Sequence, residues 1–266
     1  MLVSFFCGQL RRVYEMGGYM QAIVYLTVFL LFSCSFAVAD NIKKQVNYFV
    51  DGKPYTGLYI SPANSAPLVF LVHDWDGLTD YEMKRAEMLA EKGYAVFAAD
   101  LFGTGIRPTE LEEKKRLTVT LYDNRPLMRK LLYGALEAAR KQGANVDNSV
   151  GMGYCFGGSA ILELARSGAP LKGFVTFHGG LNLPEGQDYK AVKGKILVFH
   201  GSADTNVTLQ DFANLAELLE EEHITHEMTT YSGAPHAFTV FGSPAYREEA
   251  DKLSWERFCA FLKETL

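Results

Sequence analysis

One short segment, Gly-Met-Gly-Tyr-Cys-Phe-Gly-Gly at residues 151–158, limits the folds open to this chain more than any other feature. Cys155 stands between a strand-like run and a helical pattern, with glycines two residues before it and two after it. This spacing is typical of a sharp turn that holds a nucleophile at positive φ, because only glycine lets the strand and the helix approach so closely. A buried structural cysteine ahead of a glycine-rich turn is the alternative interpretation.

The rest of the sequence alternates between strand and helix patterns. A hairpin is predicted around Asp51-Gly52, between strands at 46–50 and 55–60. Further strands are predicted at 67–72, 95–99, 149–154, 173–177, 195–200 and 227–231. Helices are predicted at 81–92 (with Asp80 as its cap), 110–119, 125–142, 158–166, 209–222 and 247–264. This order predicts an α/β fold with a mostly parallel sheet, entered by an antiparallel hairpin and covered by helices on both faces.

Composition is consistent with one enzyme-sized domain. The chain has 266 residues, of which 48% are hydrophobic, and its formal net charge is −5 at pH 7. No basic stripe interrupts this acidic balance, so a nucleic-acid partner is not expected.

The N-terminal segment has a different character. An apolar run at 22–32 follows Arg11 and Arg12 and precedes Ala37-Val38-Ala39. A charged flank, an apolar centre and a small-x-small exit predict a secretory signal peptide over 1–39, cleaved after Ala39. A start at Met20, a membrane anchor of about 18 residues and a lipid-attachment site at Cys34 are alternatives. The predicted mature domain, 40–266, would be periplasmic or secreted, with no stable membrane span.

Cleavage would leave Cys155 and Cys259. Cys259 shares one face of the last predicted helix with Trp255, Phe258 and Leu262, at the spacing of an apolar helix face. We therefore expect Cys259 to be a small core side chain. A disulfide would disable the turn at Cys155, so both thiols are predicted to be free.

A cysteine nucleophile requires a base, and the base requires an orienting acid. Asp204 follows the strand at 195–200, and His236 lies in the loop after the strand at 227–231. The chain order of nucleophile, acid and base is that of the α/β-hydrolase arrangement. Cys155, Asp204 and His236 are therefore predicted to form a catalytic triad.

Backbone groups are predicted to complete the site. The N–H groups of Phe156, after the nucleophile, and Trp75, after the strand at 67–72, are expected to form an oxyanion hole. His178-Gly179-Gly180 has a lipase-like sequence, but it follows the wrong strand for that role. The histidines do not cluster with acidic residues in a metal-ligand pattern, so neither a metal nor an organic cofactor is expected.

Three segments together resemble the dienelactone hydrolase family of α/β-hydrolases: 153–158, 201–204 and 235–238. The resemblance spans about 45–266. It implies that the family's cysteine, aspartate and histidine correspond to Cys155, Asp204 and His236. It also implies an acid that contacts the thiol at Asp74, where the best-studied members have glutamate. A turn residue is the alternative role for Asp74.

The same resemblance identifies a difference in substrate recognition. Members that hydrolyse dienelactone hold its carboxylate with two arginines, at positions that are Thr104 and Val240 in this chain. Valine and threonine cannot supply a forked cation, so dienelactone itself is not expected to be the substrate. Arg107 is the candidate substitute, and a solvated loop arginine is the alternative.

These observations predict a hydrolase for a small ester, lactone or thioester that works through a covalent acyl-thioester. The competing hypothesis is a catalytically silent binding protein with the same fold. The sequence leaves open both a monomer and a homodimer.

Overall fold

A computed structural model describes residues 42–63 and 65–266 of the chain. The strands are β1 (Ile42–Val50), β2 (Lys53–Ser61), β3 (Pro67–Val72), β4 (Ala95–Ala99), β5 (Asn145–Tyr154), β6 (Gly173–Phe177), β7 (Lys195–Gly201) and β8 (His226–Tyr231). The helices are α2 (Asp80–Ala90), α3 (Leu111–Asp123), α4 (Arg125–Lys141), α5 (Phe156–Arg166), α6 (Leu209–Glu221) and α7 (Glu248–Thr265).

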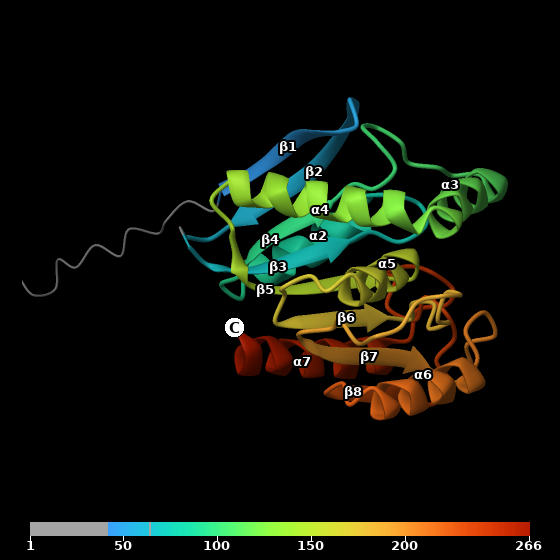
Figure 1. Ribbon diagram of the computed structural model, residues 1–266. Helices are drawn as coiled ribbons and strands as arrows, with labels where there is room; N and C mark the ends of the chain where they lie inside the picture. Colours follow the sequence, from blue (N-terminus) through green and yellow to red (C-terminus); the bar gives the residue numbers. More distant parts are fainter. Residues whose placement is uncertain (1–41, 64) are drawn as a thin grey trace, which may run out of the picture. The chain divides into compact units, whose positions relative to one another are not determined.

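All eight strands belong to one sheet with the order β1-β2-β4-β3-β5-β6-β7-β8, which runs from the hairpin to β8 in Figure 1. The β1–β2 hairpin is antiparallel, and β2 also pairs antiparallel with β4. The strands from β4 to β8 are parallel to one another. The predicted α/β-hydrolase fold is confirmed.

Local sequence explains the hairpin. Val50 pairs with Lys53, so only Asp51 and Gly52 form the connection. Both have positive φ, 50° and 75°. A two-residue turn of this kind matches the twist of the flanking strands, and Asp-Gly is one of the sequences that favours it.

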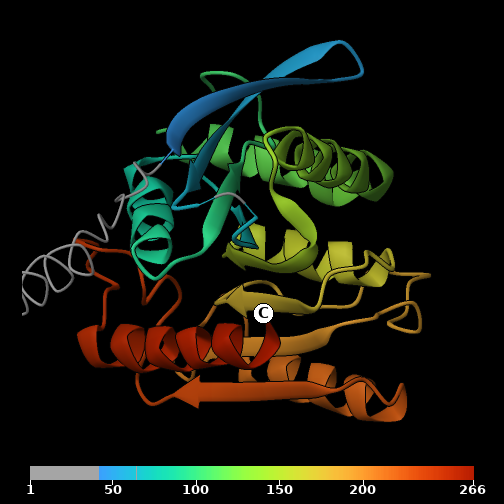
Figure 2. The same ribbon diagram turned by 90° about the vertical axis from the view of Figure 1, so that its left-hand side faces the viewer.

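The sheet is buried between two helical layers. On one face, side chains of α4, α5 and α6 join a core that includes Phe70 and Phe97. On the other face, α2 and α7 cover a second core around Phe177 and Phe258; α7, in red, lies in front of the lower strands in Figure 2. Because both faces are covered, β3 and β4 are continuous apolar runs with no alternation, as expected for central parallel strands.

Most predicted elements lie where the pattern placed them, and the bounds of β3, β4 and β6 agree exactly. The cap of α2 was predicted wrongly. Thr79, not Asp80, caps this helix: its Oγ1 accepts a hydrogen bond from the N–H of Tyr81, and Glu82 reaches back to the N–H of Thr79. This reciprocal Thr-x-x-Glu arrangement satisfies two free N–H groups, which Asp80 in the first turn cannot do.

In the described part of the chain, no helix combines the length and the apolar character needed to cross a bilayer. The predicted signal peptide at 1–39 lies outside the described residues.

Candidate active site

Cys155 lies at the turn between β5 and α5. Its φ of 49° confirms the predicted positive value, and its N–H donates to the carbonyl of Phe177 at 3.0 Å. A Cβ added at Gly153 would lie 2.3 Å from the backbone of Gly157, and one added at Gly157 would lie 2.3 Å from the carbonyl oxygen of Val72. The two glycines are therefore required by close packing, and this packing holds Cys155 in a strained conformation.

Three loops at the same edge of the sheet bring the predicted triad residues together. Cys155 follows β5, Asp204 follows β7 and His236 follows β8. His236 Nε2 lies 3.1 Å from Cys155 Sγ, and His236 Nδ1 lies 2.7 Å from Asp204 Oδ2. These contacts join residues that are 81 and 32 positions apart in the chain.

The surroundings favour a charged imidazole and an ionised acid. Burial opposes charge on His236, but its hydrogen bonds with Asp204 and Cys155 outweigh this and raise the pKa of His236 to about 10. Burial likewise opposes ionisation of Asp204, but hydrogen bonds from His236 and from the N–H groups of Val207 and Asn206 lower the pKa of its carboxyl. The imidazole therefore lies between a carboxylate and a sulfur that both stabilise its protonated form.

A buried network fixes the loop that follows His236. The guanidinium of Arg85 donates to the carbonyl of Thr239 at 2.9 Å and pairs with Asp251. The hydroxyl of Thr239 lies 2.8 Å from His178 Nε2, and the His178 ring packs edge-on against His236 with 5.3 Å between their centres. His178 thus supports His236 from behind, away from the position expected of an oxyanion donor.

Of the two predicted oxyanion donors, Phe156 directly follows Cys155 at the turn. Phe156 is the first residue of α5, so its N–H has no acceptor within the helix. Trp75 lies in the loop after β3, and Lys114 lies over its ring at 5.3 Å. Their role in binding an oxyanion stays a prediction.

Asp74 is buried next to two other acids. Its Oδ1 accepts a hydrogen bond from the N–H of Asp76 at 3.0 Å. Burial, followed by the proximity of Asp76 and Glu82, raises the pKa of Asp74 to about 10. Within residues 42–63 and 65–266, the Cys155 sulfur is hydrogen-bonded to His236 and not to Asp74. The proposed contact between Asp74 and the thiol therefore stays a prediction.

Asp74, Asp76 and Glu82 each offer a carboxylate oxygen within 4.8 Å of the others, a grouping that could hold a cation. Hydrogen bonds within the protein already satisfy two of these carboxyl groups without a cation. Asp74 Oδ1 accepts a hydrogen bond from the N–H of Asp76 at 3.0 Å, and Glu82 accepts hydrogen bonds from the N–H and hydroxyl of Thr79 at 2.9 and 2.8 Å. We therefore assign no metal to these carboxyls.

Arg107 makes contacts in two loops, its own and the one between β3 and α2. It donates to the carbonyls of Leu78 and Ile106, and its guanidinium lies 3.8 Å from Asp100. Thr104, at one of the expected arginine positions, shares a hydrogen bond of 2.9 Å with Thr56. A substrate-binding role for Arg107 stays a prediction.

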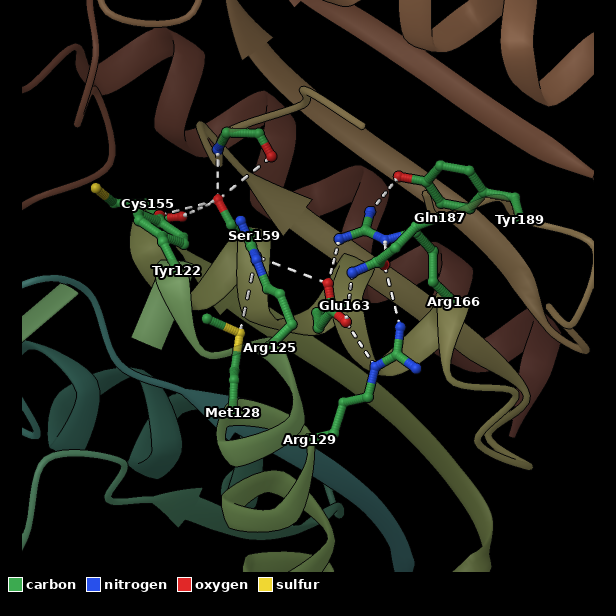
Figure 3. A network of polar contacts seen from close by, with 11 residues as sticks. Tyr122, Arg125, Met128, Arg129, Cys155, Ser159, Glu163, Arg166, Gln187 and Tyr189 are labelled. Atoms are coloured by element: carbon green, nitrogen blue, oxygen red, sulfur yellow. Dashed lines mark hydrogen bonds and ion pairs between the residues drawn. The ribbon is translucent and has the colours of Figure 1, made fainter. Parts of the chain in front are cut away.

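The sequence interpretation missed a polar network on the other side of the turn (Figure 3). Ser159 Oγ accepts a hydrogen bond from the N–H of Gly180 at 2.8 Å and lies 3.3 Å from the hydroxyl of Tyr122. Further along α5, Glu163 is fully buried among arginines. Ser159 could have been found, since it follows Cys155 by four residues on the same helix face. Tyr122 comes from α3, and no sequence signal links it to Cys155.

In the described chain both Cys155 and Cys259 are free thiols, as predicted. Cys259 is half-buried at the margin of the core on α7, and burial raises the pKa of its thiol. The two cysteines therefore differ in what surrounds them, since only Cys155 lies against a histidine.

Comparisons with known proteins identify the family of this chain. A family model described as the dienelactone hydrolase family matches residues 55–266. A provisionally named carboxymethylenebutenolidase of Saccharolobus solfataricus is 26% identical over 258 residues, which cover 84% of this chain and 98% of that protein.

Two solved structures are similar over the same region. A dienelactone hydrolase-like promiscuous phosphotriesterase from metagenomic libraries has a TM-score of 0.79 at 28% identity, covering 85% of this chain and 98% of its own. The protein m3DLH has a TM-score of 0.79 at 30% identity, with 85% and 99% covered. The chain therefore belongs to the dienelactone hydrolase family and is a hydrolase that acts on ester bonds.

Proposed function

We propose that this protein hydrolyses a small ester, lactone or thioester through a Cys155–His236–Asp204 triad and a covalent acyl-thioester. The observation that carries this proposal is the continuous contact from sulfur to imidazole to carboxylate, 3.1 Å and 2.7 Å long. Both distances are within the reach of hydrogen bonds between a nucleophile, its base and an orienting acid.

The first half of the reaction transfers the acyl group to sulfur. His236 Nε2 takes the proton from the Cys155 thiol, and Asp204 stabilises the imidazolium that forms. The thiolate attacks the carbonyl carbon, and the charge that develops on the carbonyl oxygen is held by the N–H groups of Phe156 and Trp75. The imidazolium then returns its proton to the leaving oxygen or sulfur as that bond breaks.

The second half releases the acyl group. His236 removes a proton from a water molecule, whose oxygen attacks the thioester carbon. The bond to Cys155 breaks, and the sulfur recovers its proton from His236. Because α5 begins at Phe156, the positive end of its helix dipole adds to the stabilisation of both tetrahedral intermediates.

Replacing the nucleophile tests this mechanism. The Cys155→Ala variant is expected to lose at least about 10³-fold in kcat for p-nitrophenyl esters, since the residual rate comes only from binding and the oxyanion hole. Its melting temperature should stay close to that of the wild type, because the side chain is small and lies at the end of a strand. Ester hydrolysis that survives in purified Cys155→Ala would rule the mechanism out.

Thiol labelling separates the enzyme from the silent binding protein. Iodoacetamide should modify Cys155 far faster than Cys259, because His236 Nε2 lies 3.1 Å from the Cys155 sulfur whereas burial raises the pKa of the Cys259 thiol. His236→Gln should remove most of this difference. Equal, slow labelling of both thiols would favour a catalytically silent protein.

We also propose that the enzyme acts after export, on the basis of the signal-like sequence at 1–39. Mass spectrometry of the mature N-terminus tests this, with Asp40 expected as the first residue.

A further inference from the structure

His73 is a buried histidine directly after β3, and the reaction described above gives it no role. Both nitrogens of its ring are hydrogen-bonded to the backbone. Nε2 lies 3.1 Å from the N–H of Leu101, and Nδ1 lies 2.6 Å from the carbonyl oxygen of Asp74. A buried ring that is paired at both nitrogens is held in one orientation.

The two partners also determine which nitrogen of His73 carries the proton. A backbone N–H only donates, so Nε2 accepts from Leu101 and carries no hydrogen. A carbonyl oxygen only accepts, so Nδ1 carries the hydrogen and donates it to Asp74. Burial lowers the pKa of His73, which favours the same uncharged ring. His73 is therefore the neutral tautomer with its proton on Nδ1.

The carbonyl that His73 holds belongs to the same peptide group as the N–H of Trp75. This peptide bond is trans, so its C=O and N–H point in opposite directions and can only turn together. The hydrogen bond from His73 thus fixes the direction of the Trp75 N–H, which points away from the His73 ring. In the described part of the chain this N–H donates to no acceptor, so it is available to a ligand.

His73 also packs against the residue that supplies the second predicted oxyanion donor. Its ring stacks on the ring of Phe156, with 5.9 Å between centres and 30° between planes. Phe102 packs edge-on against the His73 ring at 4.6 Å. A Cβ added at Gly157 would lie 2.5 Å from the carbonyl oxygen of His73. His73 therefore joins the loop after β3 to the start of α5, the two segments that supply the predicted donors.

We propose that His73 is a positioning residue for the oxyanion hole, which orients the N–H of Trp75 by holding the carbonyl of Asp74. The inference rests on the proposed function, because it assumes that the N–H groups of Trp75 and Phe156 bind an oxyanion. The hydrogen bond to the carbonyl also polarises the peptide group and strengthens its N–H as a donor. Because charge develops on the substrate oxygen in the transition state, loss of this bond should lower kcat and leave KM nearly unchanged.

Two substitutions separate the two hydrogen bonds of His73. The amide nitrogen of asparagine can take the place of Nδ1 and donate to Asp74, whereas the amide oxygen of glutamine can take the place of Nε2 and accept from Leu101. The kcat for p-nitrophenyl acetate should fall roughly 10- to 100-fold in His73→Gln and at most about threefold in His73→Asn, since a misdirected donor costs less than a deleted one. Equal values of kcat, or the reverse order, would overturn the assignment.

Alkylation of Cys155 by iodoacetamide distinguishes a disturbed oxyanion hole from a disturbed triad. The sulfur displaces iodide from carbon and creates no oxyanion, so the alkylation rate depends on the thiolate and not on the hole. In His73→Gln this rate should stay close to that of the wild type while kcat falls. A parallel fall in both rates would contradict the positioning role.

His200 offers a matched control. It is buried directly before Gly201 at the end of β7, and its ring stacks on Phe212 at 5.5 Å. Among the described residues neither nitrogen of this ring has a hydrogen-bond partner. His200→Asn and His200→Gln should therefore share one kcat. A preference for asparagine at position 200 as well would show that the order at His73 reflects packing and would refute the inference.

A trifluoromethyl ketone separates this inference from the proposed function. With 1,1,1-trifluoro-4-phenylbutan-2-one the Cys155 sulfur forms a bond to the carbonyl carbon, the C=O electron pair moves to the oxygen, and His236 takes the thiol proton. This adduct needs an oxyanion hole but no turnover. Its dissociation constant, from ¹⁹F NMR titration, should be at least about tenfold higher in His73→Gln than in His73→Asn.

The two failures then have different signatures. This order of adduct stability in a protein that hydrolyses no ester would support the role of His73 and refute the proposed function. Ester hydrolysis that is lost in Cys155→Ala but unchanged in His73→Gln would support the function and refute the role of His73.

Discussion

The two sides of the turn at Cys155 both contain a buried carboxylate next to arginine, but they are built differently. On the side of α2 and α7, Asp251 has one cation, Arg85, which is almost fully buried and lies 4.2 Å from the centre of the Phe241 ring. On the side of α4 and α5, Glu163 has three arginines, two of which reach solvent.

The two groups therefore differ in role: the Arg85 pair positions a loop, whereas the arginines at Glu163 lie where a ligand could bind. The Arg85–Asp251 pair is surrounded by aromatic rings, and Arg85 also donates to the hydroxyl of Tyr81 and to the carbonyl of Thr239, three residues after His236. The Glu163 group is open to a cavity and holds more positive charge than it can neutralise. A sealed ion pair fixes a loop, whereas an unbalanced cluster leaves a cation available to a ligand.

The largest expected effect comes from removing the single cation on the closed side. Arg85→Met leaves Asp251 buried without a counter-charge, so the free energy of unfolding should fall by about 3–5 kcal/mol. The kcat for p-nitrophenyl esters should fall as well, because the carbonyl of Thr239 loses its donor. Urea denaturation and steady-state kinetics measure the two effects.

Arg129→Met is the control on the open side, where Arg166 and Arg125 still face Glu163. We expect it to lose about 1 kcal/mol or less, as is usual for a partly exposed pair. Equal losses in Arg85→Met and Arg129→Met would show that the other two arginines at Glu163 do not compensate for the one that is removed.

An intermediate effect is expected from Glu163→Gln. The amide keeps the shape of the side chain but loses the charge that balances three guanidinium groups. The free energy of unfolding should fall by about 2 kcal/mol, less than for Arg85→Met, because solvent stabilises Arg125 and Arg129. In the double variant Glu163→Gln/Arg129→Met the loss should be smaller than the sum of the single losses, since the two residues share one contact. Additive losses would contradict the proposed coupling.

The smallest effect on stability is expected when the pH is lowered, and its sign should differ between Glu163 and Asp251. Burial opposes ionisation of Glu163, but Arg166 and Arg129 lower its pKa below the usual 4.5. The folded state then binds fewer protons at this position than the unfolded state, so the wild type should lose stability relative to Glu163→Gln as the pH falls through and below 4.5.

At Asp251 burial outweighs Arg85 and raises the pKa above 3.8. The folded state then binds more protons at this position, so the wild type should gain stability relative to Asp251→Asn as the pH falls towards 3.8. Urea denaturation between pH 6 and 3 would give slopes of opposite sign for the two variants. Slopes of the same sign would contradict the comparison.

Much of this molecule could be predicted because its signals are local. The Asp51-Gly52 turn and the apolar run of β3 depend on residues that are neighbours in the chain. The glycines around Cys155 are equally local, and the structure shows the close contacts that require them. The cap of α2 was missed because Thr79 and Asp80 are both good capping residues, and only the contact with Glu82 distinguishes them.

The surroundings of the nucleophile could not be predicted in the same way. Arg85 and Asp251 are 166 positions apart, and Arg129 and Glu163 are 34 apart. Neither pair has a spacing or a motif that would reveal it, since the contacts form only when helices pack on the sheet. Arg107, which the sequence identified as the candidate cation, donates to the carbonyl of Leu78, 29 positions away, and to that of Ile106.

The sequence by itself determined the alternation of strands and helices, the strained turn at Cys155 and the order of nucleophile, acid and base, because backbone geometry and strand order follow from short-range patterns. The tertiary structure alone decided which charges lie beside that turn and which of them remain unbalanced. Long-range packing brings Arg125 and Ser159 to one cavity and places Arg125 3.7 Å from Glu163, and the energy of a buried charge depends on its neighbours.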